Sequence, residues 1–281
     1  MSYRTVMLHL DLNSDNRGVL AVGGDIARRH GADVIGVAVA QPLPPLPDAG
    51  IYGGVSMTAE MIQLDREQAM RDFAVCEKQF RDALGGCKGQ LEWRSAIVSK
   101  SLPAWIAEQA RAADLIVTSP MKPFSIWESH TRVNIGALAL LAGRPVLVVP
   151  PRAESLSLRN VMVAWKDTRE ARRAISDALP LLLEAEKVVV LAVAEADELQ
   201  SARSRVEDVA RWLARHGVRA VAEAFAADTR EDIVLAEQLA ARGPDLLVAG
   251  AYGHSRLNEW AFGGVTRDIL LHAEYSVLLS H

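Results

Sequence analysis

Cysteine is nearly absent from the sequence, with two in 281 residues. Cys76 and Cys87 do not form the CxxC pair that redox-active and zinc-binding sites use, so we expect both to pack as small apolar side chains. The seven histidines form no HxH or HExxH pattern. The sequence therefore predicts neither a thiol redox centre nor a metal site.

An excess of positive charge is also missing. The chain has 31 lysines and arginines against 35 aspartates and glutamates, which gives a formal net charge of -4. Residues 1–152 carry 16 basic and 15 acidic residues, and the rest of the chain carries 15 and 20. Because nucleic-acid-binding proteins usually present a basic surface, we expect no nucleic-acid partner.

Long apolar runs are missing as well. The longest, "NIGALALLAG" followed by "PVLVVP", is interrupted by Arg144 and Pro145 and is too short to cross a bilayer. The N-terminal residues show no charged segment followed by an apolar core, as a signal peptide would. We therefore expect a cytoplasmic protein without membrane contact.

The chain contains an internal repeat. The stretch "RTVMLHLD" matches "RNVMVAWKD" at an offset of 155 residues, whereas "ADLIVTS" matches "PDLLVAG" at an offset of 131. The smaller later offset places an insertion in the first half, after Ala40 and within residues 41–75. Its start is rich in proline and glycine, which is typical of a loop. We expect a plain surface loop, with a lid over a binding site as the alternative.

Short β-branched segments alternate with helical patterns in both halves. The apolar segments are solid runs, which is typical of strands buried on both faces of a parallel sheet. The sequence therefore predicts an α/β protein of two tandem, doubly wound domains, residues 1–152 and 157–281, with a hinge at 151–160. The expected strands of the second half are "NVMVAW", "KVVVLAV", "VRAVAEAF", "DLLVAG" and "SVLLS", and the expected helices are Arg169–Ala185, Ser201–His216, Thr229–Arg242 and Val265–His272.

Two of the expected helices have local start signals. Thr229 followed by Asp232 is close to a capping box, and the helix that follows has an apolar face that includes Ile233. In the first half, Ser101 and Pro103 are expected to open a helix.

A glycine-rich stretch, "GAYGHSRLNEWAFGG", follows the apolar run "DLLVA" and precedes a helical pattern. Open α/β sheets bind ligands beyond the carboxyl ends of their strands, where the strand order reverses. Gly250 and Gly253 permit positive φ angles and close backbone approach. At the expected helix start, the free N–H groups of Gly263, Gly264 and Val265 favour an anion, as does the helix dipole.

Three side chains are candidate donors to the same anion: His254, Arg256 and Thr266. The stretch has neither the Gly-Lys-Ser/Thr end of a Walker loop nor the GxGxxG dinucleotide fingerprint. Spacing, strand context and helix context together favour a phosphate-binding loop, and a flexible turn is the alternative.

The spacing G-x2-G-x9-G followed by a small residue resembles the nucleotide-binding loop of the universal stress protein family. The resemblance extends over the whole chain, as a tandem of two such domains. It implies a five-stranded parallel sheet in the order 3-2-1-4-5 in each domain, flanked by helices, and ATP, with or without Mg²⁺, or AMP as the ligand. It further implies that adenine is held by the backbone near Ala192 and Val193, ribose by an acidic residue after the first strand and by Gly250, and phosphates by Gly253, Gly263, Gly264 and Val265.

Two positions depart from the family's pattern. Gly264 replaces the Ser or Thr that usually follows the third glycine, so a hydroxyl donor is lost while the amide remains. Lys166 stands where the ribose-binding Asp is expected, and lysine has no acceptor for ribose hydroxyls. Either Asp167 takes over, or Lys166 pairs with a phosphate, or nucleotide affinity is weak.

The first half lacks the G-x2-G-x9-G spacing, although an acidic residue, Asp11, follows its first strand. Ser119 and Pro120 stand at the place of the first loop glycine, and only Gly136 remains near the helix. This half is predicted to bind no nucleotide and to act as a partner domain. By similarity to single-domain members of the family, "PVLVVP" and "SVLLS" are expected to join the halves as a pseudo-dimer. A homodimer of the whole chain is also compatible with the sequence.

The function that the resemblance implies is that of a stress-response protein in which a bound nucleotide acts as a regulatory switch. The reactive side chains expected at the crevice form no evident general base or nucleophile set; they are Lys166, Asp167, Thr168, His254 and Glu259. We therefore expect no catalytic residues and little or no ATP hydrolysis. The alternative is a non-nucleotide scaffold that acts through protein contacts or another small ligand.

Overall fold

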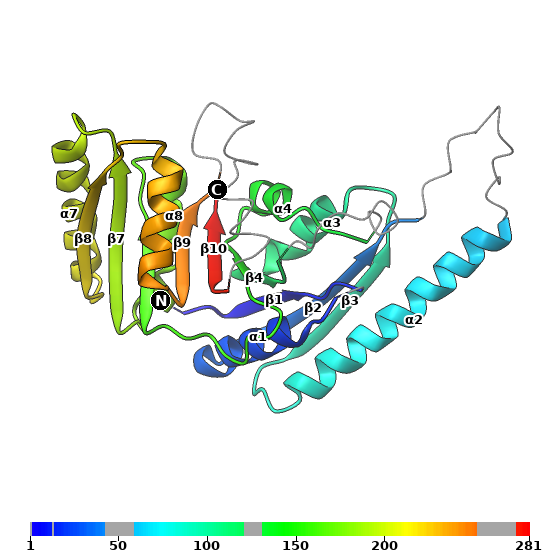
Figure 1. Ribbon diagram of the computed structural model, residues 1–281. Coiled ribbons are helices and arrows are strands. Elements are labelled where there is room, and N and C mark those ends of the chain that lie inside the picture. The colour runs from blue at the N-terminus through cyan, green and yellow to red at the C-terminus, as the bar shows by residue number, and fades with distance from the viewer. Residues whose placement is uncertain (1, 13, 43–58, 121–130, 252–273) are drawn as a thin grey trace, which may run out of the picture.

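Helices cover both faces of a large, mostly parallel β-sheet (Figure 1). The computed structural model describes residues 2–12, 14–42, 59–120, 131–251 and 274–281. Strands and helices alternate along the chain in each half. The predicted α/β class is confirmed.

The first half arranges its strands in the order β3-β2-β1-β4-β5. β1 pairs in parallel with β2 on one side and with β4 on the other, so the chain first builds the sheet in one direction and then in the other. This is the predicted order 3-2-1-4-5. The elements are β1 (Thr5–His9), α1 (Arg17–His30), β2 (Asp33–Ala40), α2 (Ala59–Leu84), β3 (Leu91–Ile97), α3 (Leu102–Gln109), a short 3-10 helix (Ala110–Ala112), β4 (Leu115–Thr118), α4 (Ile135–Ala142) and β5 (Val146–Val148).

The second half repeats this order as β8-β7-β6-β9-β10. The predicted helix Arg169–Ala185 is divided in two, because Pro180 opens a separate helical turn. The predicted helix Val265–His272 lies outside the described residues. The elements are β6 (Asn160–Ala164), α5 (Arg169–Asp177), α6 (Leu179–Leu182), β7 (Lys187–Ala194), α7 (Leu199–Arg215), β8 (Ala220–Ala226), α8 (Glu231–Arg242), β9 (Leu246–Gly250) and β10 (Ser276–Ser280).

The two sets of strands form one continuous ten-stranded sheet rather than two separate sheets. They meet where β5 and β10 pair antiparallel, with Leu147 opposite Leu278 at the centre of the contact. An unpaired edge strand exposes a row of backbone donors and acceptors, and this pairing satisfies those of both last strands. In Figure 1, β10 lies between β9 and the strands of the first half.

Side chains alternate between the two faces of the sheet, as they must along a strand. Val6 and Leu8 point into the core beneath α1, α2, α5 and α7, whereas Met7 between them points into the core beneath α3, α4 and α8. All three are fully buried. The solid apolar runs of the sequence therefore reflect burial on both faces.

The insertion in the first half is largely helical where the structure describes it. Residues 59–75 belong to α2, which has 26 residues, whereas its counterpart α7 has 17. The stretch rich in proline and glycine, where a surface loop is predicted, falls largely in residues 43–58, which lie outside the described residues. Glu, Gln, Arg and Ala, which favour helices, dominate residues 59–75. Figure 1 shows α2 extending along the outer side of the first half.

The two predicted helix starts have different outcomes. α3 begins at Leu102 with Ser101 as its N-cap residue and a proline in its first turn, as predicted. The capping box at Thr229 is wrong, because Arg230 is the N-cap residue of α8 and no side chain caps the helix. The Asp232 carboxylate instead accepts hydrogen bonds from the Ile233 amide and from Arg230.

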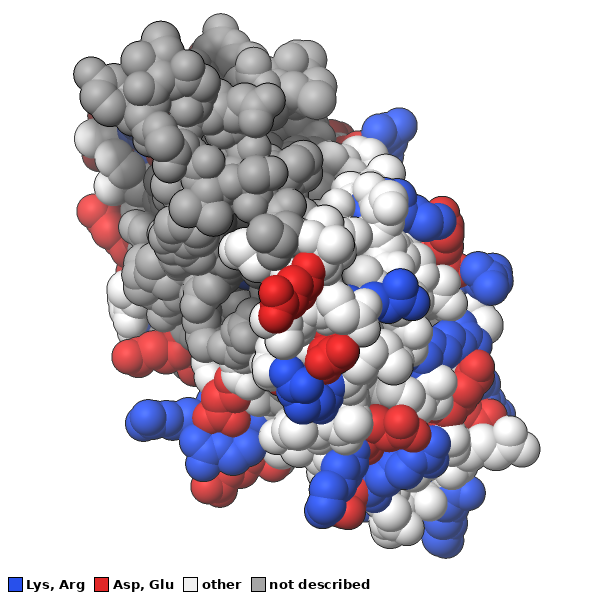
Figure 2. All heavy atoms as spheres, turned by 90° about the vertical axis from the view of Figure 1, so that its right-hand side faces the viewer, with Lys and Arg blue, Asp and Glu red and all other residues white. Residues whose placement is uncertain are grey.

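No helix in the described part of the chain is both long and apolar enough to cross a bilayer. Figure 2 views the molecule from the side of the first half and shows acidic and basic side chains interspersed over the described atoms of that face. On α2, for example, Lys78 pairs with Asp82 and Arg81 with Glu77. The described atoms of this face therefore present no continuous basic surface.

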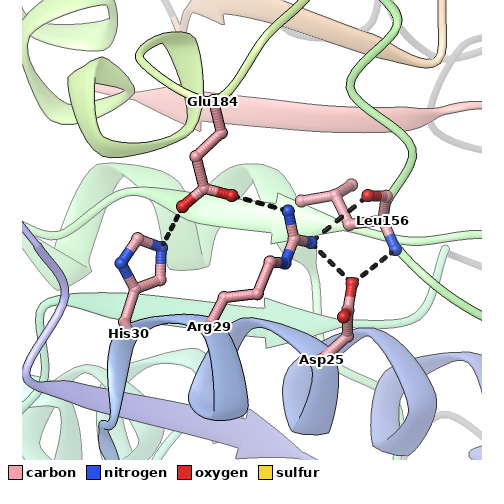
Figure 3. A network of polar contacts seen from close by, with 5 residues as sticks. All are labelled: Asp25, Arg29, His30, Leu156 and Glu184. Atoms are coloured by element: carbon pink, nitrogen blue, oxygen red, sulfur yellow. Dashed lines mark hydrogen bonds and ion pairs between the residues drawn. The ribbon is translucent and has the colours of Figure 1, made fainter.

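A polar network ties α1 to the second half on one side of the junction (Figure 3). Arg29 donates to Glu184 at 2.7 Å and contacts Asp25 at 2.5 Å and the Leu156 carbonyl oxygen at 3.2 Å. Asp25 also accepts from the Leu156 amide at 3.1 Å. His30 Nε2 lies 3.3 Å from the second oxygen of Glu184, and burial lowers the pKa of this histidine although Glu184 acts in the opposite direction.

Replacing Arg29 with alanine is expected to destabilise the protein by about 1 to 2 kcal/mol, because it leaves two carboxylates without their common partner at a partly exposed site. Chemical denaturation of the wild type and of Arg29→Ala measures the difference. Arg28→Ala, at an exposed neighbouring position of the same helix, is the matched control. Equal losses in the two variants would show that the network does not stabilise the junction.

Candidate nucleotide-binding site

The predicted site residues that the structure describes lie at the carboxyl ends of β6, β7 and β9. β6 is the central strand, and it pairs with β7 on one side and β9 on the other, with Ala164 opposite Ala249. Lys166 and Asp167 follow β6, and Gly250 ends β9. The strand order reverses between β6 and β9, which is where open α/β sheets bind ligands.

Gly250 is required for a reason that differs from the prediction. It is not among the glycines with positive φ, so the expected left-handed backbone is wrong. A Cβ atom on Gly250 would lie 2.6 Å from the Ala171 nitrogen and 2.7 Å from the Glu170 carbonyl carbon. The expected close backbone approach is real, but the neighbour is the first turn of α5. The glycine thus lets β9 end directly against a helix N-terminus.

The first turn of α5 is held by its own side chains. Thr168 is the N-cap residue, and its Oγ1 accepts from the Ala171 amide at 3.3 Å. Burial raises the pKa of Glu170, but hydrogen bonds from Arg169, from its own backbone amide and from Thr168 outweigh this and leave the pKa below its usual range. Glu170 is therefore a buried carboxylate paired with Arg169. Sequence reasoning assigned Thr168 to the reactive groups, whereas its position makes it a cap.

The start of the glycine-rich stretch is anchored by the last strand. The Ala251 amide donates to the Ser280 carbonyl oxygen at 2.7 Å, and His281 Nδ1 lies 3.0 Å from the Ala251 carbonyl oxygen. Because a carbonyl only accepts, this contact places the imidazole proton on Nδ1. His281 Nε2 then accepts from Arg169 at 3.4 Å. The backbone is thus fixed up to Ala251.

Lys166 forms an ion pair that the sequence did not reveal. Its Nζ lies 2.7 Å from Glu231 Oε2 at the start of α8, and the two side chains are 43% and 33% exposed. Asp167 pairs with Arg172 at 2.5 Å. Exposed pairs of this kind contribute little, so a bound anion or hydroxyl competes with them readily. Glu231 therefore brings a carboxylate to the place where the family's acidic residue is missing.

Ala192 and Val193 differ in the direction of their backbone groups. Trp165 donates to the Leu191 carbonyl oxygen at 2.7 Å, and Ala227 donates to that of Ala194 at 2.8 Å. Backbone groups alternate in direction along a strand, so those of Leu191 and Val193 face β6 while those of Ala192 and Ala194 face β8. β6 ends at Ala164, which pairs with Leu191, two residues before Val193. The backbone of Val193 therefore faces the crevice, and that of Ala192 is paired within the sheet.

The remaining predicted residues lie outside the described part of the chain. These are Gly253, His254, Arg256, Gly263, Gly264, Val265 and Thr266. Their roles stay predictions that depend on the spacing in the sequence.

Polar side chains near the corresponding edge of the first half bond to the protein itself. Asn16 is buried after β1, where its amide accepts from the Asp11 N–H at 3.0 Å and donates to the Asp11 carbonyl oxygen at 2.9 Å. The Asn134 side chain caps α4 by accepting from the Ala137 amide at 2.9 Å. His9, at the end of β1, bonds Thr118 at 2.9 Å.

His9 makes the first half sensitive to acid. Its buried Nε2 has no partner among the described residues, and burial lowers the pKa of His9 to about 4 although Asp11 acts in the opposite direction. Below pH 6.5 the unfolded chain therefore binds a proton at His9, whereas the folded chain binds it only as the pH approaches about 4. Stability is expected to fall as the pH drops from 6.5 to about 4, by roughly 3 kcal/mol in all.

Denaturation curves at several pH values test this expectation. In His9→Gln the loss of stability between pH 7 and pH 4.5 should be smaller than in the wild type, whatever the effect of the substitution at neutral pH. His216→Gln, at an exposed position of the second half, should lose as much stability between these pH values as the wild type does. If His9→Gln also loses as much as the wild type, then His9 is not the source of the acid sensitivity.

The two cysteines serve packing, as predicted for Cys76. Both are free, and Cys76 is buried in the core beneath α2. Burial, with smaller effects of Asp11 and Asp72, raises the pKa of its thiol to about 11. A thiol of this kind is a poor nucleophile.

The fold is shared by solved structures of low sequence identity. A universal stress protein from Archaeoglobus fulgidus is 14% identical and aligns with a TM-score of 0.72 over 98% of this chain and 95% of its own. A functionally unknown protein from Pseudomonas aeruginosa is 14% identical, with a TM-score of 0.57 over 99% of this chain and 92% of its own.

A universal stress protein from Archaeoglobus fulgidus in complex with dAMP is 22% identical and covers 53% of this chain with 99% of its own, at a TM-score of 0.31. No family model matches the sequence, and no curated protein is significantly similar to it. At these identities the alignments show that the fold is common to this chain and the first two structures.

Proposed function

We propose, on the premise that this chain has the tandem fold of the universal stress proteins, that it binds an adenine nucleotide at the carboxyl edge of its second half. One observation supports this most strongly. Gly250, the Lys166–Glu231 pair and the free backbone edge of Val193 meet at the reversal of the strand order. The G-x2-G-x9-G spacing continues from that point.

Each part of the nucleotide has a complementary group in this proposal. The N–H and C=O of Val193 hydrogen-bond the edge of adenine, and Glu231 or Asp167 accepts from the ribose hydroxyls. Lys166 is then released toward the phosphates, which lie on the amides of Gly253, Gly263, Gly264 and Val265 at a helix start. His254, Arg256 and Thr266 supply further donors, and Mg²⁺ accompanies ATP.

The proposed ligand acts as a regulatory signal rather than a substrate. The described carboxylates near the crevice are each engaged with a cation: Asp167 with Arg172, Glu170 with Arg169 and Glu231 with Lys166. A carboxylate already paired with a cation is poorly placed to accept a proton from an attacking water. We therefore expect little or no hydrolysis.

The two halves, residues 1–152 and 157–281, act as an intramolecular pair in this proposal. Their last strands pair within one sheet, and the first half, which lacks the G-x2-G-x9-G spacing, serves as the partner domain. A response to stress, a cytoplasmic location and further homodimerisation stay predictions.

A non-nucleotide scaffold is the second candidate. Lys166 in place of the ribose-binding acid favours it, because the Lys166–Glu231 and Asp167–Arg172 pairs leave the crevice electrostatically satisfied without a ligand. In that case the glycine spacing serves only the packing of β9 against α5.

Released ligand and titration distinguish the two candidates. Protein purified from cells is denatured, and the supernatant is separated by chromatography to identify adenine nucleotides. Ligand-free protein is then titrated calorimetrically with ATP and AMP. Binding with a dissociation constant below a millimolar, weakened severalfold in Glu231→Gln but unchanged in Glu237→Gln further along α8, supports the nucleotide proposal. No released nucleotide and no heat at millimolar ATP support the scaffold.

A further inference from the structure

A groove lies between α5 and α7, next to the carboxyl end of β6. It has a volume of about 510 Å³, within the range of small-molecule sites. Its apolar wall is formed by Trp165, Ile175, Val209 and Trp212, and its polar lining by Asp167, Arg172, Ser176, Arg205 and Asp208. Only Asp167 is shared with the predicted nucleotide residues.

The residues at the equivalent place in the first half differ, although both halves have the same topology. By the repeat offset of 155, Trp165 corresponds to Leu10 and Ile175 to Leu20. Leu10 and Leu20 are buried in the core, as is Phe80 of α2. Trp165 is only partly buried, as is Trp212. The second half thus has a partly exposed indole ring where the first half has a buried leucine.

The lining has one cation that no carboxylate engages among the described residues. Arg172 pairs with Asp167, and Asp208 pairs with Arg211. Arg205 instead donates to the Ser201 hydroxyl at 2.8 Å. A guanidinium beside an apolar wall is suited to a carboxylate, which it binds with two parallel hydrogen bonds.

Trp165 adds a donor at the wall of the groove. Its backbone is fixed by the bond to Leu191, and its buried Nε1–H has no acceptor among the described residues. A buried donor without a partner is unfavourable, and an acceptor on a ligand would satisfy it. The Asp167–Arg172 pair, which also lines the groove, is 46% and 59% exposed, so it opens readily to admit the ligand.

We propose that this groove binds a small planar aromatic carboxylate. The aromatic part packs against Trp165, Ile175, Val209 and Trp212, while the carboxylate accepts from Arg205 and, after the exposed pair opens, from Trp165 Nε1–H. Rings stacked on indole faces gain affinity beyond the buried area alone. The site goes beyond the proposed nucleotide function and does not depend on it.

Nuclear magnetic resonance of the indole N–H groups tests this proposal. The chain has six tryptophans, and the probe is 2-naphthoate, with 2-naphthylmethanol as its uncharged counterpart. We expect the Trp165 and Trp212 signals to shift with a dissociation constant below a millimolar for the carboxylate and at least fivefold weaker for the alcohol. Gly253→Val should bind the probe as the wild type does, which separates this site from nucleotide binding.

Substitutions assign the contacts. Arg205→Gln should weaken 2-naphthoate binding about tenfold, whereas Arg203→Gln, an exposed position of the same helix, should not. Trp165→Phe keeps an aromatic ring without the N–H and should weaken binding severalfold, whereas Trp105→Phe in the first half should not. The proposal would be overturned if the Trp165 and Trp212 signals did not shift or if all indole signals shifted equally. It would also be overturned if the two arginine variants bound 2-naphthoate with equal affinity.

Discussion

Gly250→Ala is expected to lose about 2 to 3 kcal/mol of the free energy of unfolding, although it adds only one methyl group. The new Cβ would lie 2.6 Å from the Ala171 nitrogen and 2.7 Å from the Glu170 carbonyl carbon. Both are backbone atoms, which cannot rotate aside as a side chain does, so α5 or β9 must shift. Urea denaturation measures the loss.

Gly86→Ala is the matched control for this substitution. Gly86 has no atom within 4 Å of an added Cβ and no positive φ, so a change within about 0.5 kcal/mol is expected there. If Gly250→Ala proves as stable as Gly86→Ala, then the contact between β9 and α5 does not explain this glycine.

Gly253→Val is expected to weaken ATP binding at least a hundredfold while the protein stays folded. The second glycine of the G-x2-G-x9-G spacing is predicted to bring its backbone close to the phosphates, and a β-branched side chain fills that space and disfavours positive φ. Calorimetric titration of both proteins with ATP measures the loss, and circular dichroism verifies the fold. Gly86→Ala serves again as the control and should bind as the wild type does.

An unchanged affinity in Gly253→Val would place any bound nucleotide away from the glycine-rich stretch. In that event the spacing would be a consequence of the fold, and the scaffold interpretation would gain support.

The strand order was predictable because each feature behind it is local or periodic. Solid apolar runs indicate strands buried on both faces, and the repeat between the halves means that evidence from one half applies to the other. The pairing of Leu147 with Leu278 followed only from the family resemblance, since two short apolar strands contain no signal of their partner. That the ten strands form one sheet is therefore a result of the structure.

The site was less predictable, because its chemistry depends on residues distant in sequence. Glu231 lies 65 positions from Lys166, and no spacing rule connects them. The sequence predicted close approach at Gly250 but not that α5 is the neighbour. Val193 could be separated from Ala192 only once the register of β6 and β7 was known.

Helix starts show the same division. The helix after Ser101 begins as expected, with Pro103 in its first turn, because proline restricts the backbone wherever it occurs. The pattern at Thr229 was misleading, since Asp232 instead bonds Arg230 and its neighbouring amide.

Backbone amide shifts on addition of AMP test the central claim most directly, that the nucleotide lies at the edge of the second half and not of the first. Val193 and Val39 are the paired reporters, since they occupy equivalent places in β7 and β2 at the repeat offset of 154. The account predicts that the Val193 and Gly250 amides shift in proportion to occupancy while the Val39 amide does not. A shift at Val39 with Val193 unmoved, or no shift at either, contradicts it.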